Sequence, residues 1–448
     1  MRLCVVIRVL ITLAMAVASS AIGQTNFLTL LTNGPTATRL NIVFLSEGYT
    51  TSDLAHFPSD AQTMLNRMLS SPPLAEYSNY FNAFAISVPS SQSGADHYTP
   101  TTTLVDTFFN ARYDTSGVQR LLTIDSVGRS RANSLLATYM PEYDLAAVVV
   151  NDIQYGGSGG SILVSSINSQ SPEIATHEMG HTFANLGDEY SDAGSTPSER
   201  PNTTTETNLA LIKWTLWIPE GTPIPTPDNS PYLNTIGLFR GAAYSTNYFR
   251  PKHNCKMRSL GVSFCEVCSE TLIKTIYNMI NLIEVSSPPT NVVLQLTNGL
   301  ASTFAVTNLQ PSTHSLRLQW YTNNIVLTGA TSAVLRVAGF DLPAIGTNLI
   351  RVDVTDATPA VRTGPTNMLL DSLAWKATFV ADNPPISANA GPGAIVLNWP
   401  TTAAGLYLEQ TPDLSAPPLW TPMLMISNQA GVSIATTNAR SFFRLHRP

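Results

Sequence analysis

The chain has 448 residues, of which 44% are hydrophobic and 12% are charged, and its formal net charge is −6. This length exceeds one ordinary domain, and the composition excludes wholesale disorder. The sequence has no basic patch of the kind that binds nucleic acid, so we expect no nucleic-acid partner. The low charge is made up by Thr, Ser and Asn, which is typical of secreted proteins with β-rich modules.

The N-terminal residues 1–23 predict a cleaved signal peptide. Arg2 and Arg8 precede an apolar run at 9–18, and small residues continue to Gly23. This run is too short to span a bilayer, which needs about 20 residues, so we expect no stable membrane insertion. Cleavage removes two arginines and no acid, so 24 basic side chains become 22 against 30 acidic ones, a charge of −8. We expect a secreted protein, extracellular, periplasmic or at the cell surface.

Residues 24–285 are expected to form an α/β (α+β) domain. A continuous apolar run at 145–150 predicts a buried strand, and a glycine-rich segment follows at 155–160. Helices are expected near residues 57–70, 116–139, 171–187 and 266–284. The Pro-, Thr- and Asn-rich segment 190–249 predicts a long loop that walls one side of a cleft.

The segment His177-Glu178-Met179-Gly180-His181 has the chemistry of a zinc site. Two histidines four residues apart on a helix share one face and can bind a single Zn²⁺, while Glu178 addresses water at the metal. We expect Ser171 to cap the start of this helix and Gly187 to end it. Gly180 predicts a place where another backbone or a substrate passes close to the helix.

A catalytic zinc usually has three protein ligands. Asp188, just beyond the helix, is our choice for the third, with Glu189 as its rival and His97 and His253 left open. Zinc lowers the pKa of its water to about 7, and Glu178 can then act as general base. The motif alone also occurs by accident on surface helices.

Three cysteines remain after signal cleavage removes Cys4: Cys255, Cys265 and Cys268. In an oxidising compartment we expect one pair to form a disulfide that closes the loop after Met257. The alternative is a second metal cluster with His253, because Cys265-x-x-Cys268 has zinc-binding spacing.

The C-terminal third predicts two small all-β modules. A linker at 286–290 leads to strand-length segments that predict an immunoglobulin-like β-sandwich over 290–380, and a boundary at 382–385 leads to a fibronectin-like module over 386–448. We expect these modules to act in spacing or attachment, with contact to a cell surface or polysaccharide. Trp399 and Trp420 either pack in the cores or bind carbohydrate.

Several segments together resemble peptidase family M64, which is named for bacterial IgA peptidases and is similar to the metzincins. The resemblance covers roughly residues 35–280, and its segments occur in the family's order: 41–50, 81–90, 155–160, 177–190, 236–244, 254–258 and 264–268. It implies that His177 and His181 bind zinc, that Glu178 is the base and that Asp188 is the family's acid. The metzincin pattern would instead place the third ligand at Gly187.

The resemblance also assigns roles outside the helix. Met257 resembles the methionine beneath the metzincin zinc, and Tyr155, Gly156 and Gly157 lie where a strand pairs with extended substrate. An ordinary buried methionine and a flexible glycine loop are the alternatives. Two positions depart from the family: Ser46-Glu47 replaces Gly-Asp, and Arg240 replaces an expected acid.

Together these observations predict a secreted zinc-dependent endopeptidase with one catalytic Zn²⁺ and a protein or peptide substrate. The first alternative is an inactive M64-like protein that serves in surface binding or adhesion. The second is a hydrolase that cuts another kind of bond with the same zinc and base. These alternatives stay open because Arg240 replaces an expected acid and because the third zinc ligand is not decided by the sequence.

Overall fold

The computed structural model describes residues 25–192, 196–297, 301–342, 346–365, 367–379, 386–400, 403, 405–415, 418–427, 430–435 and 440–446. The predicted signal peptide and the boundary at 382–385 lie outside these residues. No helix in the described part of the chain is long and apolar enough to cross a membrane. The chain divides into two compact units: the first comprises residues up to 280 with 311–314 and 358–368, and the second comprises the rest.

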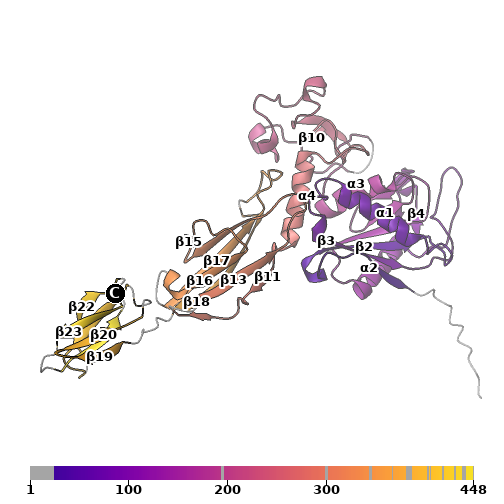
Figure 1. Cartoon of the computed structure of the whole chain (residues 1–448). Coiled ribbons are helices and arrows are strands. Elements are labelled where there is room, and N and C mark those ends of the chain that lie inside the picture. Colours follow the sequence, from indigo (N-terminus) through magenta and orange to yellow (C-terminus); the bar gives the residue numbers. More distant parts are fainter. Residues whose placement is uncertain are drawn as a thin grey trace, which may run out of the picture. The chain divides into compact units, whose positions relative to one another are not determined.

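A six-stranded mixed sheet organises the first unit (Figure 1). Its order is β1-β3-β2-β6-β8-β7, and the three internal neighbour pairs β3-β2, β2-β6 and β6-β8 are parallel, while β1 and β7 are antiparallel edge strands. The predicted strand at 145–150 is confirmed as β6. The bounds are β1 Asn26–Leu31, β2 Leu40–Glu47, β3 Phe81–Ser87, β6 Leu145–Val150, β7 Gly157–Ser158 and β8 Leu163–Ser166.

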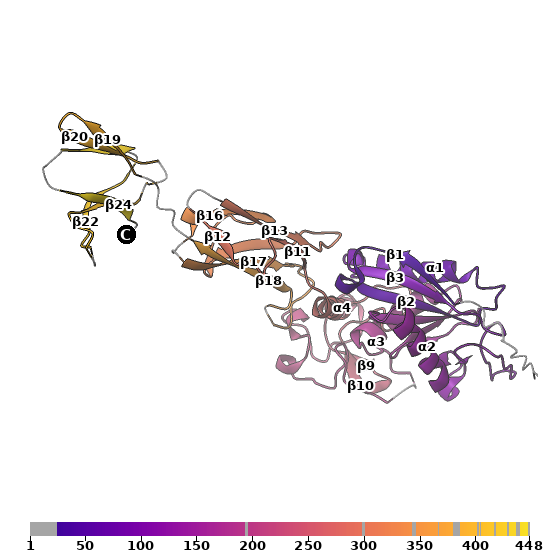
Figure 2. The ribbon, with the colours of Figure 1, turned by 90° about the horizontal axis from the view of Figure 1, so that it is seen from below.

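Helices cover both faces of this sheet, which explains why β2, β3 and β6 are buried along their whole length. Val43, Val148 and Leu136 share a core with α2 Ser126–Tyr139 on one face. On the other face α1 Phe57–Ser70 contacts β3 and β6, and α3 Ser171–Ala184 contacts β8 and α1 (Figure 2). The α1 bounds confirm the predicted helix, and its buried residues recur at helical spacing: Phe57, Ala61, Met64, Leu65 and Met68.

Two predicted helices are too long. The helix expected from residue 116 begins at Ser126, because the Asp125 side chain accepts a hydrogen bond from Gly128 N at 2.7 Å and caps it. Short strands β4 Ala111–Arg112 and β5 Thr123–Ile124 precede it. The last helix of the unit, α4 Glu266–Met279, does not reach residue 284, because the chain becomes extended at Ile280 and enters a strand of the second unit.

The ends of α3 also differ from prediction. Gln170 takes the N-cap position in place of Ser171. The helix ends at Ala184 and not at Gly187, because Asn185 adopts the left-handed conformation with φ 53° and its N–H returns to the carbonyl of His181. Leu186 N donates to Gly180 O at 3.0 Å, which completes the helix end.

The segment 191–242 starts just after α3, and the residues on its two sides are hydrogen-bonded to each other. Ala243 N donates to Asp188 O at 2.8 Å, and Tyr244 N donates to Tyr190 O at 3.0 Å. The predicted loop is more ordered than expected, since β9 Phe239–Ala242 pairs with β10 Ser245–Arg250 and Trp214 lies in an apolar cluster with α4 residues.

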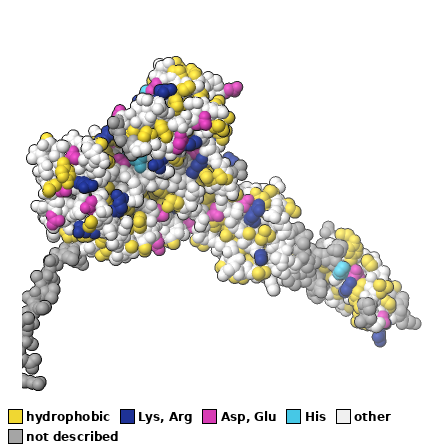
Figure 3. Space-filling model, turned by 180° about the vertical axis from the view of Figure 1, so that it is seen from behind, with side chains coloured by type: hydrophobic (Ala, Val, Ile, Leu, Met, Phe, Trp, Pro, Cys, Tyr) yellow, Lys and Arg dark blue, Asp and Glu magenta, His cyan; other side chains and the backbone are white. Residues whose placement is uncertain are grey.

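Over the face drawn in Figure 3, acidic and basic side chains are interspersed.

The second unit is β-rich. Two sheets, β11-β13-β16 and β12-β18-β17-β14-β15, meet at the ring contact of Phe304 with Trp375, and Trp320 stacks on Trp375 within the second of these sheets. Trp399 is buried in the core of two further three-stranded sheets, β19-β20-β23 and β22-β21-β24, which favours packing for its ring. The bounds of the first two sheets are β11 Ile283–Ser287, β12 Leu294–Leu296, β13 Ala301–Asn308, β14 Arg317–Thr322, β15 Ile325–Val326, β16 Val334–Ala338, β17 Gly346–Thr355 and β18 Leu370–Phe379. Those of the last two are β19 Ser387–Gly391, β20 Ala394–Asn398, β21 Tyr407–Thr411, β22 Thr421–Met425, β23 Gly431–Ala435 and β24 Phe442–His446.

Candidate metal centre

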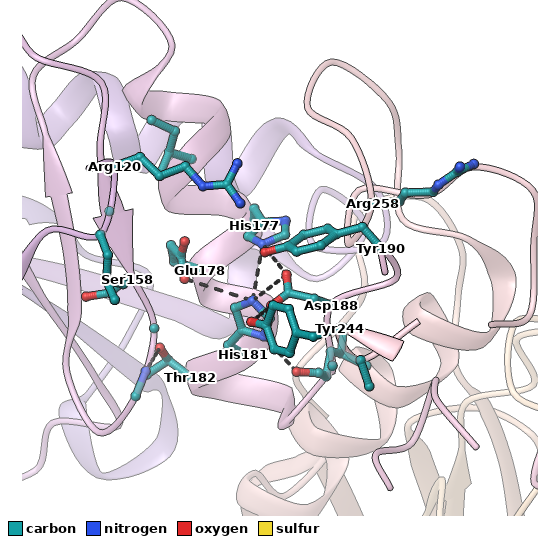
Figure 4. Close-up of a pocket in the computed structure, with 18 of the residues that line it drawn as sticks. Arg120, Ser158, His177, Glu178, His181, Thr182, Asp188, Tyr190, Tyr244 and Arg258 are labelled. Atoms are coloured by element: carbon teal, nitrogen blue, oxygen red, sulfur yellow. Dashed lines mark hydrogen bonds and ion pairs between the residues drawn. The ribbon is translucent and has the colours of Figure 1, made fainter. Parts of the chain in front are cut away.

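A cavity of about 950 Å³ lies against the C-terminal half of α3 (Figure 4). Its walls are α3 with the turn that follows, the segments 116–121 and 155–160, the returning segment around Tyr244, and residues from the segments 196–200 and 258–260. His177, Glu178, His181 and Asp188 all line it. Its size suits a peptide segment or a comparable ligand.

The two histidines are held by hydrogen bonds behind their rings. Nδ1 of His177 donates to the backbone carbonyl of Lys256 at 2.8 Å, and Nδ1 of His181 donates to that of Leu186 at 2.7 Å. Because a carbonyl can only accept, both Nδ1 atoms carry the proton and both Nε2 atoms can offer lone pairs. The Nε2 atoms lie 3.1 Å apart, an arrangement of two acceptors that a shared cation would stabilise.

Asp188 completes a triangle of donor atoms. Its Oδ1 lies 3.2 Å from His177 Nε2 and 3.3 Å from His181 Nε2. Ligands in a tetrahedral zinc site, at bond lengths of about 2.0–2.1 Å, are about 3.3 Å apart. Burial raises the pKa of Asp188, but the two histidines lower it by more, so this pKa lies well below its usual value. The residues present therefore fit zinc, and the fourth direction opens to the cavity.

Glu178 lies beside this triangle and not in it. Its Oε2 is 4.0 Å from His181 Nε2, and burial raises the pKa of its carboxyl group. A Cβ on Gly159 would come within 3.1 Å of that oxygen, so the glycine segment packs directly over the carboxylate. Glu178 is thus placed to exchange a proton with a group in the cavity.

Two tyrosines that the motif did not predict as site residues hold the outer side of Asp188. Tyr244 donates its hydroxyl to Asp188 Oδ2, which leaves Oδ1 for the histidines. The Tyr190 ring packs edge-on against Tyr244 at 5.5 Å, and both rings line the cavity. Burial and then the charge of Asp188 raise the pKa of both phenols. The Asp188-Glu189-Tyr190 run was the available sequence signal for Tyr190.

Met257 explains the glycine in the middle of α3. A Cβ on Gly180 would lie 2.6 Å from Met257 Sδ, so only glycine lets the methionine pack against the helix. The close approach expected at Gly180 is therefore made by a side chain, and neither backbone nor substrate is involved. Met257 is fully buried behind the two histidines' helix.

Only two of the three predicted substrate-binding residues line the cavity. Tyr155 and Gly157 line the cavity, whereas Gly156 does not, since its α-carbon faces the Tyr113 ring and the Arg120 carbonyl. Gly157 N already donates to Arg120 O at 3.3 Å, so the segment 118–121 occupies the outer edge of β7 at this point. Residues 158–160 continue along the cavity wall, where Gly160 N donates to Thr182 Oγ1 at 3.3 Å.

The expected disulfide is absent from the described part of the chain. Cys255, Cys265 and Cys268 are buried free thiols, and the Sγ atoms of Cys255 and Cys268 lie 3.7 Å apart, compared with about 2.05 Å in a disulfide. These thiols converge on Glu189, not on His253. The Glu189 carboxylate faces away from the two histidines, toward Cys268.

The remaining candidates lie elsewhere. His97 bonds Asp152 at 2.8 Å, and His253 pairs with Asp228, so neither joins the triangle. Glu47 is buried at the end of β2, where it accepts hydrogen bonds from Thr107 and from the backbone N–H groups of residues 109 and 111. Arg240 is exposed on β9, lies over the Phe249 ring and does not line the cavity.

A family model described as IgA Peptidase M64 matches residues 28–235 and 228–276. The chain belongs to this peptidase family, and the matched range contains every residue of the cavity described above. No curated protein sequence matches the chain.

Solved structures give only distant similarities. They include the chicken interferon gamma receptor alpha chain, at 7% identity and a TM-score of 0.18, covering 36% of this chain and 89% of that one. They also include SGBP-B of the Bacteroides ovatus mixed-linkage glucan utilization locus (12% identity, 37% and 40% covered, TM-score 0.17) and three N-terminal domains of the bacteriophage RB49 capsid protein Hoc (12%, 37% and 57%, 0.16). Such scores do not define the fold of any part of this chain.

Proposed function

We propose that this chain is a secreted zinc-dependent endopeptidase. The observation that carries the proposal is the triangle formed by the Nε2 atoms of His177 and His181 and Oδ1 of Asp188, with sides of 3.1–3.3 Å. This spacing and the paired Nδ1 hydrogen bonds suit one Zn²⁺ with an open position toward the cavity. Family membership supports a peptide or protein substrate.

His177, His181 and Asp188 would hold the ion. When bound there, zinc supplies Lewis acidity that polarises a carbonyl oxygen and makes water a nucleophile near pH 7. Lys256 O and Leu186 O fix the two rings, and Tyr244 fixes the carboxylate, so the three donor atoms need little rearrangement. Met257 against Gly180 supports the same helix from behind, as in the metzincin arrangement that the sequence resembles.

Glu178 would act as the general base and then as the proton donor to the leaving amine. Its carboxylate is beside the triangle and outside it, which suits proton transfer in place of metal binding. Gly159 packs against the carboxylate and limits its rotation. An extended substrate would lie along residues 158–160, because Gly157 already pairs with the 118–121 segment.

The inactive surface-binding alternative is not favoured by the position of Arg240. That side chain stacks on Phe249 outside the cavity, so its charge reversal leaves the cavity unchanged. Secretion follows from the predicted signal peptide, and attachment to a surface or polysaccharide would be the work of the β-rich second unit.

The experiment is hydrolysis of an internally quenched peptide library by the full chain, before and after chelation and after return of zinc. We expect cleavage inside peptides that chelation abolishes and zinc restores. Stoichiometric zinc without cleavage of any peptide would overturn the peptidase proposal and leave the binding protein or another hydrolase. Absence of zinc from the intact chain would overturn the metal centre itself.

A further inference from the structure

A second group of ligand-type side chains lies behind the cavity wall. Glu189, Cys255, Cys265 and Cys268 are buried, and their ligand atoms all lie within 4.8 Å of one another. None of the four lines the cavity. We call these four residues the cysteine cluster.

The distances within the cysteine cluster suit a metal ion better than a disulfide. Cys255 Sγ and Cys268 Sγ are 3.7 Å apart, and Cys268 Sγ is 3.2 Å from Glu189 Oε1. Sulfur ligands of a tetrahedral zinc, at bonds of about 2.3 Å, are about 3.8 Å from one another. A bond of about 2.05 Å between two of these sulfurs would require the backbone or side chains to shift.

Glu189 supplies an independent observation. Its side chain is fully buried, and Oε2 has no hydrogen-bond partner among the described residues. Oε1 accepts from Asn202 Nδ2 at 2.9 Å and from the Cys268 thiol. A buried carboxylate oxygen without a partner is costly unless a cation or a proton satisfies it.

The local sequence presents the sulfurs together. Cys265 is the N-cap of α4, and Cys268 lies in its first turn, so the Cys-x-x-Cys spacing brings both thiols to the helix N-terminus, where the helix dipole favours thiolates. Cys255 enters from the turn that carries Met257, and its Sγ accepts from Cys265 N at 3.1 Å.

We infer that Glu189, Cys255, Cys265 and Cys268 bind a second metal ion with a structural role. Thiolates and a carboxylate oxygen are all zinc ligands, and four of them in a buried site off the cavity lining match a structural zinc, which leaves no position open to a substrate. This site is separate from the triangle in the cavity and involves none of its residues.

The proposed ion would fix the back of the cavity. Glu189 follows Asp188 directly, and Glu189 N donates to Met257 O at 2.8 Å. Cys255 precedes Lys256, whose carbonyl holds the His177 ring. A metal in the cysteine cluster would therefore tie together the segment after α3, the Met257 turn and the start of α4, and would set the position of Asp188 and His177 indirectly.

The test uses the full chain with Cys4→Ser, so that only the cluster thiols are counted. We would measure metal content and take the cobalt absorption spectrum of His177→Ala/His181→Ala, which removes two cavity ligands and leaves the cysteines intact. We expect about one metal ion per chain to remain, compared with about two in the parent, and a strong near-ultraviolet sulfur-to-cobalt band. Loss of both the ion and the band would overturn the inference.

Thiol counting separates the metal from a disulfide without relying on a cluster variant that folds. In denaturant with chelator and no reductant, the parent chain should show about three reactive thiols, and without chelator the native chain should show almost none. A count of about one would mean a disulfide and would overturn the metal site. Cys265→Ser/Cys268→Ser should lose one ion and the sulfur band, whereas the neighbouring control Ser269→Ala should keep both.

Because the histidine variant removes the cavity triangle, failure of the proposed peptidase activity and failure of the second site are distinguishable. A chain that retains the sulfur band but never cleaves peptide would support the cysteine cluster alone.

Discussion

Asp188 and Glu189 are adjacent in the chain, yet their carboxylates belong to two groups of ligand-type side chains with opposite surroundings. Asp188 meets two imidazoles at the wall of a cavity, whereas Glu189 meets three thiols in a closed interior. Nitrogen and oxygen donors with one open direction suit chemistry, and sulfur donors with none suit structure. The difference is one of access to the cavity, and it underlies the two roles proposed above, a reactive site for Asp188 and a supporting one for Glu189.

The largest effect is expected from a change that affects only the site in the cavity, which we call the open site. Glu178→Gln should lower kcat for a cleaved peptide by about 10²–10⁴-fold, because it removes the proposed general base. Metal content should not change, since Glu178 lies outside the triangle. Initial rates with a quenched peptide and metal analysis test this. The exposed residue Glu220 offers a matched control, Glu220→Gln, that should retain full activity. Equal rates for the two variants would contradict the role of Glu178.

Tyr244→Phe should weaken zinc binding at the open site by about 10–100-fold, because the phenol no longer holds Asp188 Oδ2. Binding of the ion proposed for the cysteine cluster should be unaffected. Competition with a chromophoric chelator measures both affinities in one titration. Tyr232→Phe, which changes a tyrosine outside the cavity, is the control. A uniform loss of both ions would show that the hydroxyl acts through the fold as a whole.

Gly180→Ala tests the wall between the two groups. The new methyl would lie 2.6 Å from Met257 Sδ, so overpacking should lower the free energy of unfolding by about 1–3 kcal/mol, even though alanine favours a helix by about 1 kcal/mol. Urea unfolding measures the change. Gly180→Ala should cost less when it is made in a Met257→Ala background than in the parent, because the sulfur is then absent. A single variant more stable than the parent would refute the proposed packing.

The smallest effect is expected at a position that differs from the family pattern. Arg240→Glu restores the expected acidic charge on an exposed strand, and the free energy of unfolding should change by no more than about 0.5 kcal/mol. The ratio kcat/KM should stay the same, because the side chain does not line the cavity. A clear rise in kcat/KM would indicate that Arg240 restrains activity.

The sequence predicted the elements whose signals are local. The helix 57–70 and the strand 145–150 have the predicted bounds, because amphipathic spacing and an uninterrupted apolar run each indicate one structure. The bounds of α3 were wrong because Asn185, two residues before the expected Gly187, takes the left-handed conformation. Nothing in the residue types distinguishes these two ends, since both asparagine and glycine tolerate that conformation.

The residue spacing along one helix was enough to predict part of the site. His177 and His181 share a face by geometry alone, but the choice between Asp188 and Glu189 depends on which way each carboxylate faces after the helix ends. The prediction of a disulfide was wrong for a similar reason. The spacing of the cysteines does not reveal that a buried carboxylate lies beside all three thiols. Contacts between residues far apart in the chain decide both points.

The hydrogen bonds from Ala243 N to Asp188 O and from Tyr244 N to Tyr190 O close the excursion 191–242 at its base. Because both ends are fixed at one place, lengthening this excursion changes mainly its loop entropy, by about 0.6 kcal/mol for each doubling of length. Insertions beyond Asn202, which holds Glu189, would therefore lengthen the excursion while the two histidines and Asp188 keep their positions. The shape of this cavity wall can thus vary in length without a change at the base of the excursion.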